Sequence, residues 1–225
     1  KISGYLSYYN LNSKNEAVEN NQTLVQQNTV IDMGFRLENR HILNPNMVLN
    51  TGYQYNETGI RNFENIDNPG FSKSIKEVLR SHSLISEAEM YYLDRHLFIK
   101  PGFRFNYIEE LEKYIFEPRL QFNYRLTQEI SIEVLGELKS QTASQVIDQQ
   151  QDFLGIEKRR WVLADDRSIP IQKSRQASVG FTYNTSDWLI SLDNFYKKVT
   201  GITTPSQAFQ NQLEFIKLNG DYTVL

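Results

Sequence analysis

Alternation of apolar and polar residues constrains the fold of this chain more than any other feature. In the segment 116–126, FEPRLQFNYRL, every second residue is apolar or aromatic and every residue between is polar or charged. Because successive side chains of a β-strand point to opposite faces, this segment predicts a strand with one apolar and one polar face. The same alternation recurs in the segments 31–38, 47–55, 84–92, 97–107, 130–138, 177–183 and 188–196. We therefore expect an all-β, antiparallel fold.

A soluble sandwich with one face in water would show the same alternation. Two features favour a transmembrane barrel instead. The polar faces carry several full charges per strand, and aromatic residues gather towards the strand ends on the apolar faces, where a barrel places its interfacial girdles. These residues are Tyr53, Tyr55, Phe105, Tyr107, Trp188 and Tyr196. Strands of about 9 to 12 residues also match a tilted bilayer crossing.

The connectors between these strands are alternately short and long. Short connectors are expected at 39–46, 94–96, 127–128 and 184–187, and long ones at 12–23, 57–82, 108–115, 140–173 and 200–219. Outer-membrane barrels sort their connections in this way, with short periplasmic turns and long extracellular loops. Within the second long connector, Ile75, Val78 and Leu79 have helical spacing, which predicts a short helix at the barrel rim.

Composition excludes several classes of protein. A net charge of -3, spread along the chain, offers no basic surface for nucleic acid. There are 13 Tyr and 13 Phe, too many aromatic residues for a disordered chain. Cys is absent and the chain has three His, so thiolate metal sites are excluded. His82 and His96 are expected on opposite membrane sides, and we predict neither a metal site nor a cofactor.

Charged residues of the polar parity are the candidates for lining a lumen. They are Arg104, Glu117, Arg119, Arg125 and Glu133. They could line a solute path or hold a plug, and the alternative is a network of cross-strand ion pairs. In the long connector 140–173, Arg159, Arg160 and Trp161 are candidates for an extracellular ligand site, because Arg and Trp often anchor recognition surfaces. Alternatively, Trp161 and Leu163 pack this loop against its neighbours.

The stretch 116–221 resembles the barrel of TonB-dependent outer-membrane transporters, particularly the Bacteroidota type, and the first half resembles it more loosely. The matching pieces are Glu117-Pro118-Arg119 opening a strand, Gly136 followed by Gln141, Lys173-Ser174 leading into Gly180, and Phe195-Tyr196-Lys197 closing a strand. Their order and spacing carry the resemblance.

The resemblance implies a barrel of about 22 strands around a plugged lumen. Residues 1–225 would form one barrel segment of about ten strands, with the plug domain and about twelve strands outside the chain. The chain begins and ends within strand-like stretches and lacks an aromatic C-terminal residue, so we expect it to be part of a larger wall.

The implied function is TonB-dependent import of a scarce solute, such as a siderophore, haem, a vitamin, a peptide or a glycan, across the outer membrane of a Gram-negative bacterium. The implied partners are outer-membrane lipid, the protein's own plug, the TonB energy complex acting through that plug, and a surface lipoprotein lid. The alternatives are a structural or secretion-associated barrel and a membrane-embedded hydrolase built on Ser81-His82-Ser83. Adjacent residues of a strand point apart, so we expect no enzyme.

Overall fold

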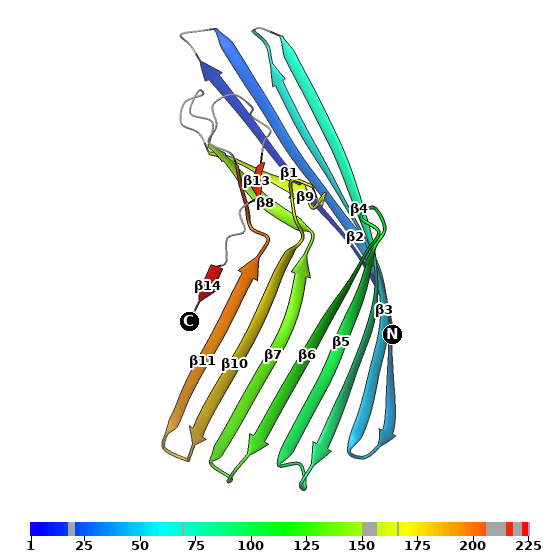
Figure 1. The fold of residues 1–225 in the computed structure, drawn as a ribbon, viewed down its shortest axis with the longest axis vertical. Helices are drawn as coiled ribbons and strands as arrows, with labels where there is room; N and C mark the ends of the chain where they lie inside the picture. Colours follow the sequence, from blue (N-terminus) through cyan, green and yellow to red (C-terminus); the bar gives the residue numbers. More distant parts are fainter. Residues whose placement is uncertain are drawn as a thin grey trace.

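A computed structural model describes residues 1–17, 21–68, 70–149, 157–165, 167–205, 215–217 and 222–224. These residues form strands and turns (Figure 1). The strands are β1 (Ile2–Ala17), β2 (Gln22–Asn44), β3 (Met47–Ile66), β4 (Phe71–Tyr92), β5 (Leu97–Ile108), β6 (Lys113–Arg125), β7 (Ile130–Gln141), β8 (Ala143–Gln149), β9 (Glu157–Leu163), β10 (Gln172–Asn184), β11 (Leu189–Thr200), β12 (Thr203–Pro205), β13 (Phe215–Lys217) and β14 (Tyr222–Val224).

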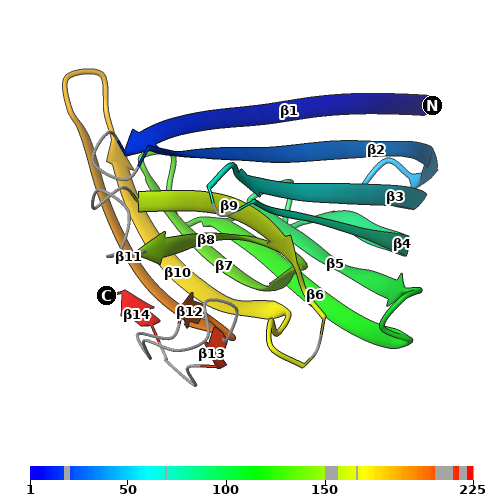
Figure 2. The same ribbon diagram turned by 90° about the horizontal axis from the view of Figure 1, so that it is seen from above.

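One ten-stranded antiparallel sheet makes up most of the molecule, in the order β1-β2-β3-β4-β5-β6-β7-β10-β11-β14. The neighbours are consecutive in the chain except at two places. The β8–β9 hairpin leaves the sheet, so that β10 pairs with β7, and β12 and β13 pair with each other, so that β11 pairs with β14. Figure 2 shows that the sheet curves and that the β8–β9 hairpin lies on its concave side. The predicted all-β, antiparallel barrel wall is confirmed.

The cross-strand register places the two sequence parities on opposite faces of the sheet. Leu120 lies opposite Gly136, which lies opposite Ala177, whereas Arg119 lies opposite Glu137. The face of Leu120 exposes a band of large apolar side chains, and we call it the outer face. The face of Arg119 carries the charges and the β8–β9 hairpin, and we call it the lumenal face.

The strands differ in length across the sheet. Strands β5, β6, β7, β10 and β11 have 12 or 13 residues, near the predicted span. Strands β2, β3 and β4 have 23, 20 and 22 residues and, together with β1, which pairs with β2 up to Ala17↔Gln22, extend past the others at one end of the wall (Figure 1). The connectors expected at 12–23 and 57–82 are therefore mostly strand.

The helix predicted around Ile75, Val78 and Leu79 is wrong. Strand β4 runs through all three residues and pairs with β3 from Ile66↔Phe71 onwards. Three apolar residues at this spacing fit either a helix or a strand with both faces partly covered. The unbroken ladder with β3 supplies the backbone hydrogen bonds that a helix would have made internally.

The connectors predicted to be short lie together at one end of the sheet, which we call the turn end, and the other end is the loop end (Figure 1). The predicted strict alternation of connector lengths fails, because at the loop end four residues join β1 to β2, β3 to β4 and, in the turn from Glu109 to Glu112, β5 to β6. Glu112 adopts a φ of 52°, which such a tight reversal requires. Among the described residues, no helix is long and apolar enough to span a membrane.

The β8–β9 hairpin packs against the extended part of the sheet. Leu163 and Ala164 join a buried cluster with Ile60 of β3, Leu79 of β4 and Ile108 of β5. All three sheet residues belong to the lumenal parity, and the hairpin therefore covers the lumenal face near the loop end.

Candidate functional site: the lumenal face

Paired charges occupy the middle of the lumenal face. Glu87 of β4 accepts from Arg119 Nη1 at 3.1 Å and lies 3.1 Å from Lys100 Nζ. Glu89 lies 3.5 Å from Arg40 Nη2, and its other oxygen accepts from Asn50 Nδ2 at 3.0 Å. These carboxylates are less than one-fifth exposed, so their partners compensate for lost hydration.

A second polar group surrounds Arg104 of β5. Its Nε donates to Asn106 Oδ1 at 2.8 Å and its Nη2 donates to Ser83 Oγ at 2.9 Å. Ser83 is almost fully buried and donates to Asn106 at 2.7 Å. The arrangement fixes the guanidinium beside Glu117, its cross-strand neighbour.

Glu117 is buried at the point where the β6–β7 ladder ends. The ladder runs from Arg125↔Ser131 to Arg119↔Glu137, beyond which the two strands separate. The carboxylate of Glu117 accepts from the backbone N–H of Ser140 at 2.6 Å and also from the Ser140 hydroxyl. It thereby satisfies a backbone donor that has lost its partner on β6.

The five lumen-lining candidates do not form one cluster. Arg104, Glu117 and Arg119 lie in neighbouring rows on β5 and β6. Glu133 accepts from Asn123 Nδ2 at 3.3 Å nearer the turn end, and Arg125 is exposed at the end of β6. A lumenal hollow of about 240 Å³ is lined in part by Glu87, Lys100, Arg119, Glu137 and Gln176.

The three loop candidates lie on strand β9. The side chain of Arg159 lies outside the described residues. Trp161 is partly buried and packs against the cluster of Ile60 and Leu79. Its backbone is held to the wall, because its N–H donates to Asn28 Oδ1 at 3.3 Å and its carbonyl accepts from Asn62 Nδ2 at 3.2 Å. This placement favours the packing alternative for Trp161, and ligand binding by this loop stays a prediction.

Sequence reasoning missed the residues that dock the hairpin and one close lumenal contact. Asn28 and Asn62 bond to each other at 2.6 Å as well as to Trp161. Tyr5 lies over Gly34, where an added Cβ would come within 2.9 Å of its ring, and accepts from Asn56 at 2.6 Å. The alternation of the sequence predicts that these residues face the lumen. It does not predict which distant residues they contact.

His82 was expected at the end of the long connector 57–82, but it lies within β4. Its ring faces outward, with Nδ1 2.6 Å from Tyr53 Oη and Nε2 2.5 Å from Glu109. Ser83 points into the lumenal network, so His82 and Ser83 lie on opposite faces and form no catalytic pair. No group of three or more His, Cys, Asp or Glu among the described residues is placed to hold a metal ion.

Comparison with known proteins gives fold-level likenesses. No family model matches the sequence, and no curated protein does. Among solved structures, the unliganded ferric citrate transporter FecA matches with a TM-score of 0.64 and 13% identity over 95% of this chain and 34% of that one. The ferric enterobactin receptor PfeA of Pseudomonas aeruginosa, in complex with enterobactin, gives 0.61 and 13% over 91% and 33%. The siderophore receptor PirA of the same species gives 0.59 and 12% over 99% and 44%.

These likenesses define the class of the fold. The chain has the fold of a segment of an outer-membrane β-barrel wall, of the kind found in TonB-dependent receptors. It spans less than half the length of these solved receptors. A wall with an apolar outer face and a charged inner face belongs in the outer membrane of a Gram-negative bacterium, where closed barrels cross the bilayer.

Proposed function

We propose that residues 1–225 form part of the barrel wall of a TonB-dependent receptor that imports a scarce solute across the outer membrane. The observation that carries this proposal is the lumenal face, where paired charges line the wall and an inward-folded hairpin narrows it near the loop end. A polar lumen with an inward-folded segment is the arrangement found in barrels whose interior is plugged.

A plug domain from outside this chain would lie against the lumenal face. Arg36, which is ion-paired to Glu38 at 2.9 Å, also has a buried Nε without an acceptor among the described residues. Buried donors are rarely left unpaired in complete proteins, and a polar plug would supply the acceptor. Arg104, Glu117, Arg119, Arg125 and Glu133 would then support the plug, and Arg160 would contribute to solute capture at the loop end.

Transport is tested in the natural host with the gene deleted. We expect uptake of at least one probe from a panel of ferric citrate, ferric enterobactin, haem, cobalamin, labelled peptides and labelled glycans to be lost. The same probe should also fail to enter when the TonB energy complex is inactivated. If the deletion strain took up all of the probes as fast as the native strain, an import role would be overturned. That result would favour a structural or secretion-associated barrel.

Sidedness is tested with two isosteric cysteines, because the chain has no Cys of its own. Ser72 lies in the loop-end extension of β4, and Ser186 lies in the turn-end connection between β10 and β11. In the full-length protein on intact cells, Ser72→Cys should react with an impermeant maleimide and Ser186→Cys should not. Labelling of Ser186→Cys alone would invert the proposed orientation.

A further inference from the structure

Strand β9 is held to the lumenal face through its backbone as well as through its side chains. The N–H of Trp161 donates to Asn28 Oδ1 at 3.3 Å, and the carbonyl of the same residue accepts from Asn62 Nδ2 at 3.2 Å. The Glu77 carboxylate accepts a further hydrogen bond from the backbone of Leu163. Any residue other than proline offers these backbone groups, so the three contacts do not depend on the sequence of β9.

These contacts lie along one edge of β9. On the other edge β9 pairs with β8, and the Ala164 N–H donates to the Thr142 carbonyl at 2.7 Å. In an antiparallel pair, alternate residues direct both of their backbone groups to the partner strand. Val162 and Ala164 therefore face β8, whereas Trp161 and Leu163 face away from it. The wall thus binds the outer edge of an extended strand.

The two asparagines are bonded to each other. Asn28 is buried, and its Nδ2 donates to Asn62 Oδ1 at 2.6 Å. This bond fixes the orientation of both amides, which leaves the Asn28 oxygen as an acceptor and Asn62 Nδ2 as a donor. An acceptor beside a donor matches the N–H and the carbonyl of one residue in an extended chain. The pair therefore offers what a neighbouring strand offers when a peptide is added to a sheet.

An apolar patch beside the pair receives alternate side chains of β9. We use this name for Ile60, Leu79 and Ile108, which form a buried cluster with Leu163 and pack against Trp161. Side chains two positions apart on an extended chain point to the same side, so the patch selects apolar residues at positions i and i+2. Backbone hydrogen bonds with pockets for alternate side chains are the means by which proteins recognise extended peptides.

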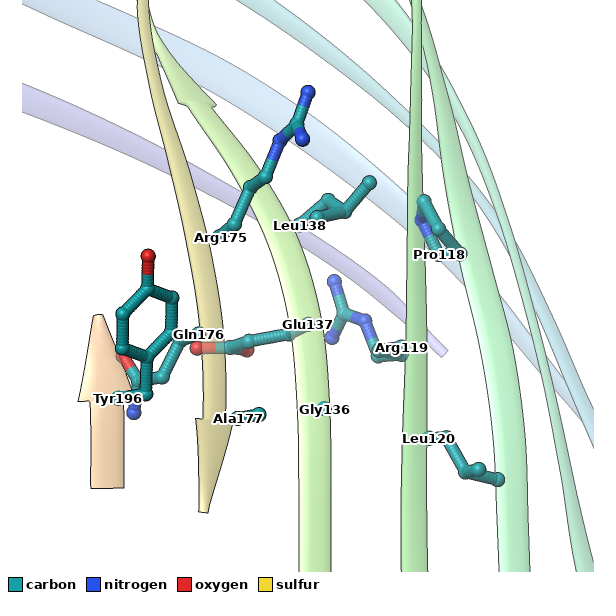
Figure 3. A pocket seen from close by; sticks show the side chains of 10 residues that line it. All are labelled: Pro118, Arg119, Leu120, Gly136, Glu137, Leu138, Arg175, Gln176, Ala177 and Tyr196. Atoms are coloured by element: carbon teal, nitrogen blue, oxygen red, sulfur yellow. The ribbon is translucent and has the colours of Figure 1, made fainter. Parts of the chain in front are cut away.

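The hairpin is an addition to a sheet that is continuous beneath it. Strands β7 and β10 pair directly with each other, and Figure 3 shows Gly136 of β7 beside Ala177 of β10 in that ladder. Because this ladder does not include β8 and β9, the wall stays intact when the hairpin leaves the lumenal face.

Docking of the hairpin also has a cost. Burial raises the pKa of Glu77, and the charge of Asp165 adds to this. The two carboxylates therefore repel each other when the hairpin is docked, and a strand without an acidic residue at that position avoids the repulsion. This repulsion limits how firmly β9 is held.

We propose that the Asn28–Asn62 pair and the apolar patch form a binding site for an extended peptide with apolar side chains at alternate positions, and that β9 occupies this site as an internal mimic of the peptide. A peptide solute would displace β9 and take over its backbone contacts. The inference rests on the proposed function for its role in import, and it names peptides as the class of solute.

The test uses the full-length protein in detergent and a fluorescent peptide with the sequence RRWVLA of residues 159–164. In Trp161→Ser/Leu163→Ser the hairpin loses its apolar anchors. This variant should bind the peptide about tenfold or more tightly than the native protein, whose tethered β9 competes at an effective concentration of about millimolar. Fluorescence anisotropy measures the affinity.

A second variant removes the hairpin outright, with residues 143–163 replaced by a Gly-Ser link. It should bind the peptide as well as the first variant does. Each variant is first checked for folding by its heat-modifiable migration on gels. If neither variant bound the peptide more tightly than the native protein, the site would be overturned.

The asparagines are tested in the variant that lacks the hairpin. Asn28→Ala and Asn62→Ala should each weaken peptide binding by about two- to tenfold, as the loss of one hydrogen bond does. Asn56→Ala is the matched control, because Asn56 lies on the same face of β3 as Asn62 and donates to Tyr5 at 2.6 Å instead. It should leave the affinity unchanged, and equal weakening by Asn56→Ala would contradict the site.

Two modified peptides test recognition of the backbone. N-methylation at the Trp of the peptide removes the N–H that would donate to Asn28, and should weaken binding by about two- to tenfold. N-methylation at the Val, whose N–H faces away from the wall, should leave the affinity unchanged. Asn28→Ala should bind the unmodified and the Trp-methylated peptide alike. Equal weakening by both methylations would overturn the proposal.

Peptide binding and import fail separately in these experiments. If the peptide did not bind while uptake of another probe still depended on the gene, the peptide site would be wrong and import would stand. If the peptide bound as expected while the deletion strain took up every probe as before, import would be wrong and the peptide site would stand.

Discussion

The two faces of one sheet have opposite chemistry although their residues alternate along the same strands. On β6, Leu120 contributes to an exposed apolar band, and Arg119 beside it is held in an ion pair with Glu87. Outward side chains are stabilised by lipid, whereas inward ones need specific partners. The same substitution should therefore have different effects at positions one residue apart.

A charge placed in the middle of the outer face should produce the largest difference. Val179 of β10 is half exposed at mid-height of the apolar band. Val179→Arg should lower the stability of the full-length protein in bilayers by about 2–4 kcal/mol, the cost of Arg at the membrane midplane. Urea titration of the protein folded into lipid vesicles measures this change.

Ser178→Arg is the matched control, since Ser178 is adjacent in the chain and faces the lumen. Its effect should stay below about 1 kcal/mol, because lumenal positions tolerate charge. If both variants lost the same stability, the assignment of the two faces would fail.

A methyl group added at glycine should produce the next largest difference. At Gly34 on the lumenal parity, a Cβ would lie 2.6 Å from the carbonyl oxygen of Tyr55 and 2.9 Å from the ring of Tyr5. Gly34→Ala should destabilise the barrel by about 1–3 kcal/mol, as overpacking does. At Gly136 a Cβ meets nothing within 4 Å, and Gly136→Ala should be neutral or slightly stabilising.

The same urea titration measures both alanine variants. A loss at Gly136→Ala as large as that at Gly34→Ala would show that the outer face is packed against something besides lipid.

Sequence predicted the faces of the short strands because the bilayer imposes the pattern. Within the membrane, outward residues are predominantly apolar, and every outward residue of 116–126 is apolar or aromatic. Beyond the membrane the outer face meets water and the constraint ends. The outward positions Glu57, Arg61 and Asn65 of β3 are polar, so alternation faded and strand was interpreted as connector.

The docking of the hairpin could not be predicted for a different reason. It depends on Asn28 and Asn62, which are 133 and 99 residues from Trp161 in the chain. Their side chains meet the backbone of Trp161 only after the register of β2, β3 and β9 is set. From the sequence of the loop alone, ligand capture and packing were equally reasonable roles for Trp161. The fold favours packing.

Paired side chains should respond to salt differently on the two faces. Arg119 and Glu87 form a lumenal ion pair, and Phe103 and Phe116 form an outer aromatic pair with centroids 5.6 Å apart. Double-mutant cycles to alanine should give coupling energies of about 0.5–1 kcal/mol for each pair. Raising the salt from 0.05 to 0.5 M, roughly a threefold shorter screening length, should reduce only the lumenal coupling.

Stability measured by urea titration at both salt concentrations provides the two cycles. Lys100 stays beside Glu87 in Arg119→Ala, and the expected coupling is therefore modest. Equal salt dependence of both couplings would contradict the view that ionic partners organise one face alone.

The smallest expected effect is a pH dependence of the docking of the β8–β9 hairpin, which lies on the lumenal face. Partial burial raises the pKa of Glu77 above its ordinary value and the charge of Asp165 adds to this, while a hydrogen bond with the backbone of Leu163 and the charge of Arg160 oppose it. A carboxyl with a raised pKa in the docked state binds its proton more tightly when docked. Docking is therefore strongest below the ordinary carboxyl pKa and weakens as pH rises through the raised value.

Glu77→Gln should remove this pH dependence. Hydrogen exchange at the backbone amide of Ala164, which donates to the Thr142 carbonyl at 2.7 Å, reports on the hairpin. After correction for intrinsic rates, its protection should fall between pH 4 and 7 in the native protein and stay level in Glu77→Gln. Glu112→Gln, in an exposed turn, removes the same charge and should keep the native pH trend. If the protection of Ala164 fell with rising pH in Glu77→Gln as it does in the native protein, the pH response would belong to a group other than Glu77. The docking of the hairpin would then weaken although the Glu77 carboxylate was absent.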